Sequence, residues 1–206
     1  EIGSGLVGSE MCIRDRKSID RIAKPSAQIL EAKQKILFQL GTQSFANADF
    51  EQALKYLNQS IAIGQYNRQT KADAYYWCGE SYYRLSRMVE AARDFNAYLQ
   101  LTTQPNNEMY ALANYNLGYI AFHRKDYTQA SNYFQKYVQL EKGENATALA
   151  DAYNRIGDCH LHVRNFEEAK QYYSQAEQMN TSSGDYSFYQ LALVSGPVSY
   201  THLTLP

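Results

Sequence analysis

Residues 117–134, LGYIAFHRKDYTQASNYF, hold the pattern that decides the fold. An apolar run with a glycine inside it passes through the charged segment RKD into a second run, in which small and aromatic residues recur at helical spacing. Two helices joined by a short polar turn are the simplest structure with this pattern. Glycine inside a helix costs about 1 kcal/mol relative to alanine, so Gly118 needs a packing reason.

This pattern occurs four times along the chain. Glycines recur at spacings of 38, 39 and 39, and each is followed by a large apolar residue after nine positions, an alanine after twelve and a leucine or aromatic residue after sixteen. The glycines are Gly41, Gly79, Gly118 and Gly157. Constant spacing within a unit indicates a rigid helix pair, and repetition of the unit indicates a solenoid. We expect the alanine of the second helix to face the glycine of the first.

The four stretches LGTQSFANADFEQALKYL, CGESYYRLSRMVEAARDF, LGYIAFHRKDYTQASNYF and IGDCHLHVRNFEEAKQYY resemble tetratricopeptide repeats (TPR). The resemblance implies an all-α fold: a right-handed superhelical solenoid of antiparallel helix pairs. The expected repeats cover 34–71, 72–110, 111–149 and 150–183, and 184–196 is expected to be the first helix of a truncated fifth repeat. These units run 38 or 39 residues instead of about 34, and they lack the usual closing proline.

The two ends of the chain do not share this periodicity. VGSEMCIRDR near the start and VSYTHLTLP near the end resemble translated sequencing-adapter read-through. We therefore expect residues 1–16 and 197–206 to be non-native tails. Residues 17–33 are expected to form a linker and the start of the first helix, because Pro25 disfavours a helix there.

Composition excludes several kinds of function. With 20 basic and 21 acidic residues, the chain has no basic excess for nucleic acid, and no apolar run is long enough to insert into a membrane. The sequence lacks a phosphate-binding glycine loop, GxSxG and HExxH, so we expect no enzyme activity and no cofactor. Cys159, His160 and His162 suggest a metal or redox site, but adjacent helical residues diverge by about 100°. We expect a packed thiol and two ordinary histidines there, with no metal.

The resemblance implies that first-helix positions 2, 5, 9, 12 and 13 line a concave groove, counting from Gln34, Ala72, Ala111 and Ala150. The expected partner-binding residues are Phe38, Tyr76, Glu80, Tyr83, Tyr115, Tyr119, Phe122, Asn154 and Asp158. Position 5 is expected to form an aromatic ladder, whereas for position 12 packing between repeats is the open alternative. Acidic residues at positions 2 and 9 outnumber basic ones and favour a basic or neutral peptide. They are Asp73, Glu80, Asp151 and Asp158, against Lys35 and Arg84.

Together these observations predict a bacterial protein-interaction scaffold that binds a protein or peptide and is a piece of a larger protein. The alternative is an accessory repeat region of a regulatory sensor or enzyme whose catalytic or DNA-binding domain lies elsewhere. Tyr- and Gln-rich repeats of this length are similar to those of envelope-associated assembly proteins, so we expect a periplasmic or outer-membrane-associated location, with a cytoplasmic one as the alternative.

Overall fold

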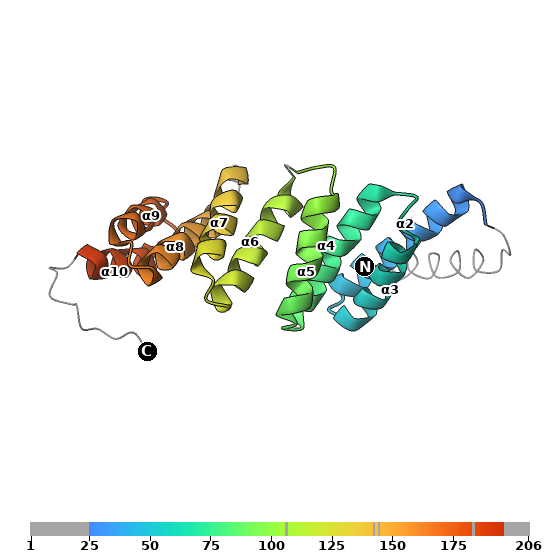
Figure 1. Ribbon diagram of the computed structural model, residues 1–206, viewed down its shortest axis with the longest axis horizontal. Coiled ribbons are helices and arrows are strands. Elements are labelled where there is room, and N and C mark those ends of the chain that lie inside the picture. The colour runs from blue at the N-terminus through green and yellow to red at the C-terminus, as the bar shows by residue number, and fades with distance from the viewer. Residues whose placement is uncertain (1–24, 106, 142, 144, 183, 196–206) are drawn as a thin grey trace, which may run out of the picture. The chain divides into compact units, whose positions relative to one another are not determined.

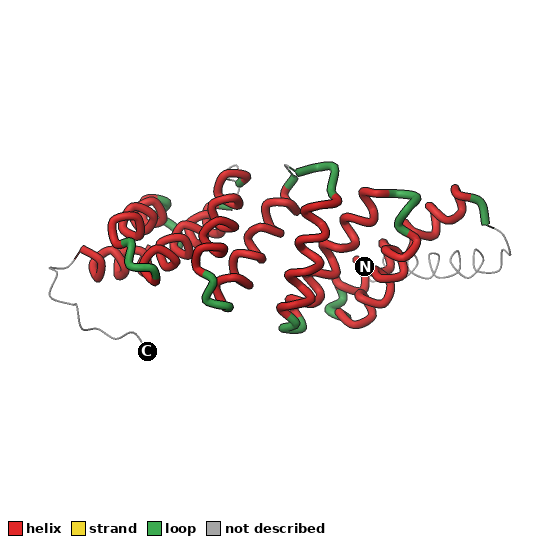
Figure 2. The backbone as a smooth tube through the Cα atoms, viewed as in Figure 1, coloured by secondary structure: helices red, strands yellow, loops and turns green. Residues whose placement is uncertain are grey.

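The computed structural model describes residues 25–105, 107–141, 143, 145–182 and 184–195. The two expected non-native tails lie outside these residues. Within them the chain forms nine α-helices and no strand (Figures 1 and 2). The chain divides into two compact units, Glu1–Pro105 and Asn106–Pro206, which we call unit 1 and unit 2.

Each unit contains two helix pairs. Unit 1 holds α2 (Ala27–Ala46) with α3 (Phe50–Ile63), and α4 (Arg68–Arg84) with α5 (Met88–Leu101). Unit 2 holds α6 (Glu108–His123) with α7 (Tyr127–Leu140), α8 (Ala146–His162) with α9 (Phe166–Gln178), and the single helix α10 (Gly184–Ser195). The fold is therefore an all-α repeat solenoid, as the sequence pattern predicted.

Polar side chains fix where many of these helices begin. Six helices begin after an Asn, Asp or Ser whose side chain accepts a hydrogen bond from the backbone N–H three residues later. Such caps satisfy amide groups that have no partner inside the helix. The capping residues are Ser26, Asp49, Asn67, Asn107, Asp126 and Asn145.

The turn inside each pair is a left-handed C-cap without glycine. Ala48, Ser86, Lys125 and Arg164 have φ angles of 59°, 59°, 62° and 63°. In the first turn the N–H of Asp49 donates to the carbonyl of Ser44 at 2.9 Å, and the same bond recurs in the other three turns. The bond closes the helix end as a Schellman motif does, which offsets the strain of a positive φ at a non-glycine residue.

The glycine of each first helix lies against a large side chain of the second. A Cβ placed on Gly79 would come within 2.8 Å of Phe95, and one on Gly157 within 2.6 Å of Tyr173. The atoms nearest to a Cβ placed on each glycine belong to the residue sixteen positions later, and not to the alanine twelve positions later that we expected to face it. The four alanines are nevertheless fully buried in the pairs: Ala53, Ala91, Ala130 and Ala169.

Candidate functional site

In unit 1 the expected partner-binding residues divide between surface and core. Tyr76 is only 4% exposed, and its ring packs edge-on against Trp77, Phe95 and Tyr98 at centroid distances of 5.4, 5.8 and 5.4 Å. It is a core residue of the second helix pair, which corrects the expectation that it anchors a partner. Phe38 is partly buried beside the core of the first pair.

The other two expected residues of unit 1 lie on the partly buried surface of α4. Glu80 forms an ion pair with Arg84 at 4.0 Å, one helical turn away. Burial raises the pKa of Tyr83, so its hydroxyl stays protonated as a hydrogen-bond donor.

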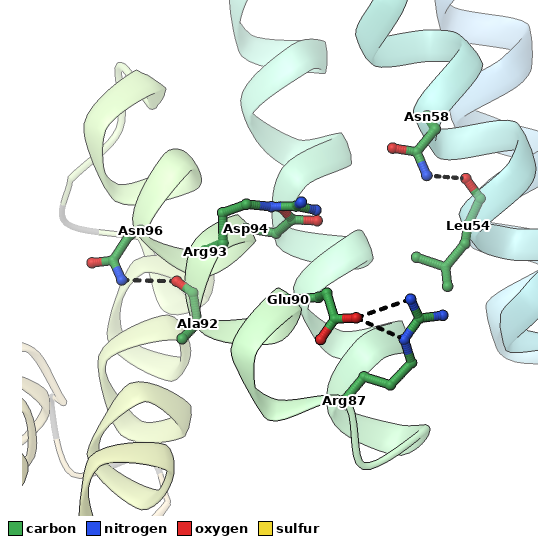
Figure 3. Close-up of polar contacts among 8 residues, drawn as sticks. All are labelled: Leu54, Asn58, Arg87, Glu90, Ala92, Arg93, Asp94 and Asn96. Atoms are coloured by element: carbon green, nitrogen blue, oxygen red, sulfur yellow. Dashed lines mark hydrogen bonds and ion pairs between the residues drawn. The ribbon is translucent and has the colours of Figure 1, made fainter. Parts of the chain in front are cut away.

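A charged group is buried on the opposite helix of this pair, α5. Asp94 is 1% exposed, and one of its carboxylate oxygens lies 2.7 Å from Nε of Arg93; the close-up in Figure 3 shows this pair beside the surface pair Arg87–Glu90. Burial raises the pKa of Asp94. Burial, and then the charge of Asp94, also raise the pKa of the Cys78 thiol, which favours its neutral form.

Unit 2 brings its expected residues together into a connected polar cluster. On α8, Asp151, Arg155 and Asp158 follow one another at spacings of four and three, which places them on the same helix face. Arg155 Nη1 lies 2.8 Å from Asp158 Oδ2, and its Nε lies 3.7 Å from Asp151 Oδ1. We call these three residues and the tyrosines bonded to them the acidic cluster.

Four tyrosines from three helices complete the acidic cluster. Tyr115 and Tyr119 of α6 both donate to Oδ2 of Asp151, the former at 2.7 Å. Tyr173 of α9 and Tyr186 of α10 both donate to Oδ1 of Asp158, each at 2.7 Å. Burial raises the pKa of all four hydroxyls, with a further contribution from the neighbouring carboxylates, so they remain donors.

The two aspartates of the cluster differ in exposure. The side chain of Asp158 is 7% exposed, and burial raises its pKa although Arg155 opposes this. The side chain of Asp151 is 26% exposed, and among the described residues its Oδ1 makes only the 3.7 Å contact to Arg155. The cluster holds two acids and one base, and its excess negative charge therefore lies at Asp151, where solvent reaches it.

The remaining expected residues border the acidic cluster. Phe122 lies under the Arg155 guanidinium, at 5.9 Å from ring centroid to Cζ. Asn154 is 1% exposed, and its side-chain oxygen accepts from Ser187 of α10 at 2.9 Å, so it joins two helices instead of facing a partner. Arg155, Tyr173 and Tyr186 of this cluster were not among the residues expected from the sequence. The spacing of Arg155 from the two aspartates was a readable signal, but the tyrosines reach the cluster only through the fold.

The Cys-His segment at the end of α8 runs from the buried Cys159 through the partly buried His160 to the exposed His162. Cys159 is 1% exposed, and burial raises the pKa of its thiol to about 12. His162 stacks on Tyr127 at 4.1 Å, and His160 stacks on Tyr172 at 5.4 Å. Among the described residues, no three His, Cys, Asp or Glu side chains lie close enough together to hold a metal ion.

None of the described helices is both long and apolar enough to cross a membrane.

Comparison with known proteins supports the prediction of tetratricopeptide repeats. Two family models, each described as tetratricopeptide repeat, match residues 38–108 and 108–182. No curated protein matches the sequence closely enough to count as a relative.

Solved structures with this fold are similar along most of the chain. The crystal structure of BtubC (BKLC) from P. vanneervenii is 17% identical with a TM-score of 0.62, covering 93% of this chain and 83% of that one. YrrB, described as a TPR protein with an unusual peptide-binding site, is 15% identical with a TM-score of 0.62, covering 89% and 85%. The apo form of RapI is 15% identical with a TM-score of 0.65, covering 86% of this chain and 51% of that one. At these identities the likeness concerns the fold.

Proposed function

Because the chain belongs to the tetratricopeptide-repeat family, whose members are typically protein-interaction scaffolds, we propose that the acidic cluster of unit 2 binds a basic segment of a partner protein. The observation that carries this proposal is that the two carboxylate oxygens of Asp151 have different contacts. Two tyrosine hydroxyls hold one of its oxygens, while the other makes only a 3.7 Å contact to Arg155 among the described residues, and 26% of the side chain is exposed.

A lysine or arginine of the partner is the group that this arrangement favours. It would neutralise the excess charge of the cluster, and the bonds from Tyr115 and Tyr119 hold the carboxylate in place before binding, which lowers the ordering cost. Tyrosine rings beside a carboxylate also attract a cation through their faces. Asp158 does not compete for the ligand, because Arg155 and two tyrosines already satisfy it.

Binding of a peptide array to the full chain tests this proposal. Peptides that carry Lys or Arg should bind, and the same peptides with Gln at those positions should not. Asp151→Asn should weaken binding about tenfold, the size expected for losing one charge contact worth about 1.4 kcal/mol. Glu168→Gln is the matched control, since it removes one negative charge from an exposed position on α9.

Two results would contradict the proposal. If both variants weaken binding equally, attraction is spread over the whole surface and does not reside at Asp151. If the Gln-substituted peptides bind as well as the basic ones, the acidic cluster is not the recognition element.

A further inference from the structure

A second site lies on the other side of α8 from the acidic cluster. A cavity of about 200 Å³ opens between α7, the end of α8 and Asn165, which directly precedes α9. Residues two apart on a helix point about 200° away from each other, so His160 faces away from Asp158. The residues that line the cavity are Tyr127, Thr128, Ser131, Asn132, Gln135, Cys159, His160, Val163 and Asn165.

The wall of this cavity combines apolar surface with polar groups, and the described residues that line it include no Asp, Glu, Lys or Arg. Hydroxyl and carboxamide groups come from Thr128, Ser131, Asn132 and Asn165. Gln135 also lines it and donates to Tyr172 at 3.2 Å. Burial raises the pKa of the Cys159 thiol to about 12, so this residue adds no anion. A charged ligand would lose its hydration here without gaining an opposite charge.

His160 is the group that lacks its hydrogen bonds. Its ring stacks on Tyr172 with an interplanar angle of 12°, and among the described residues neither Nδ1 nor Nε2 has a hydrogen-bond partner, although both atoms are shielded from solvent. A buried polar group without a partner costs about 1–3 kcal/mol and calls for a ligand or a small rearrangement that supplies one. A neutral imidazole offers one donor and one acceptor.

The cavity has the size of one side chain. Its volume is below the roughly 300–1,000 Å³ of small-molecule sites and well above the roughly 30 Å³ of one water. We propose that it receives a single carboxamide side chain, glutamine or asparagine, from a partner protein. The amide N–H group pairs with the acceptor nitrogen of His160 and its carbonyl with a donor of the wall, after a small rotation of the imidazole. This inference rests on the proposed function as a protein-interaction scaffold.

Propionamide, the side-chain analogue of glutamine, is the probe for this site. We expect it to shift the ring resonances of His160 in ¹³C-histidine-labelled full chain, with a saturable dependence on concentration. His123, exposed at the end of α6, is the internal control and should not respond. Propionate and 2-butanone, which have a similar size but lack the amide N–H group, should bind at least tenfold more weakly.

Two variants test whether the response to propionamide arises in the cavity beside His160. His160→Phe keeps the stack on Tyr172 but removes both nitrogens, and it should abolish the saturable response, followed through Cys159 or the α8 amides. Asn132→Arg changes an exposed position of the wall and should block entry even if His160→Phe proves poorly folded.

No saturable shift with propionamide, equal shifts with propionate, or an unchanged response in Asn132→Arg would each overturn the inference. The titration needs no peptide, so its failure is separate from failure at Asp151. If basic peptides bind and propionamide does not, only the carboxamide site is wrong; in the reverse case, only the Asp151 proposal is wrong.

Discussion

Gly118 of α6 lies directly beneath the ring of Phe134 on α7. A Cβ placed on Gly118 would come within 2.8 to 2.9 Å of three ring atoms of Phe134, closer than side-chain carbons approach one another. Phe134 is completely buried and also contacts Tyr115 and Tyr119, whose centroids lie 5.8 and 5.2 Å away. The ring therefore has little freedom to yield, and the same residues position the tyrosines that hold Asp151.

Gly118→Ala should accordingly lower the free energy of unfolding. Overpacking costs about 1–3 kcal/mol, which exceeds the roughly 1 kcal/mol that alanine gains in helix propensity. Urea unfolding of both proteins measures the difference. Gly184→Ala is the control, because the added methyl group meets no atom within 4 Å there, and it should not destabilise. A more stable Gly118→Ala would show that the ring can move aside.

The helix pairs were predictable because their signals are local. Glycine, alanine and aromatic residues at constant offsets define the pair, and the polar turns lie where the pattern changes. Which residue faces the glycine was not predictable. The crossing geometry of the two helices decides between the alanine at Ala130 and the ring at Phe134, and a one-dimensional pattern does not contain it.

The candidate site was predictable only in part, because equivalent positions have different neighbours. Tyr76 and Tyr115 share one register position, and each ring packs on the equivalent aromatic pair, Phe95 and Tyr98 or Phe134 and Tyr137. Tyr76 is nevertheless buried, whereas Tyr115 is only partly buried and its hydroxyl reaches Asp151. The residue types alone identified Asp151 and Asp158 as acids at this face of the repeat. The pairing that leaves Asp151 as the exposed acid depends on tyrosines 15 and 28 residues from Asp158 along the chain, which no local pattern indicates.

The acid at the equivalent position of unit 1, Asp73, should show its burial in a pH dependence. Burial raises its pKa above the ordinary value of 3.8, although a hydrogen bond from Gln69 at 2.7 Å opposes this. Because the folded-state pKa is the higher one, Asp73 favours folding below about pH 3.8, and this contribution is lost as pH rises through the folded-state pKa.

Asp73→Asn does not ionise, so its stability relative to the unchanged protein should increase as pH rises. Urea unfolding at about pH 3.5 and pH 7 gives the two differences, and shifts of the other acids cancel in the comparison. Asp185→Asn, on the first turn of α10, controls for the general loss of one negative charge. If the stability of Asp73→Asn relative to the unchanged protein instead falls as pH rises, the folded protein stabilises Asp73 in its charged form.

The two tyrosines that donate to Asp158 should differ in their contribution to stability, although their hydrogen bonds have the same length of 2.7 Å. Tyr173 is 0% exposed, and its ring lies on Gly157, so no water can replace its hydroxyl. Tyr173→Phe keeps the ring and leaves a buried carboxylate one donor short, which costs roughly 1–3 kcal/mol. Tyr186 on α10 is only partly buried, and water can take over its bond, so Tyr186→Phe should cost about 1 kcal/mol or less.

Urea unfolding ranks the two variants, and hydrogen exchange should show faster opening in α10 for Tyr186→Phe alone. Tyr189→Phe, at a position that is 60% exposed, should change neither measurement. Equal losses for Tyr173→Phe and Tyr186→Phe would show that the hydrogen bond itself, and not the exclusion of water around Asp158, sets the energy of this cluster.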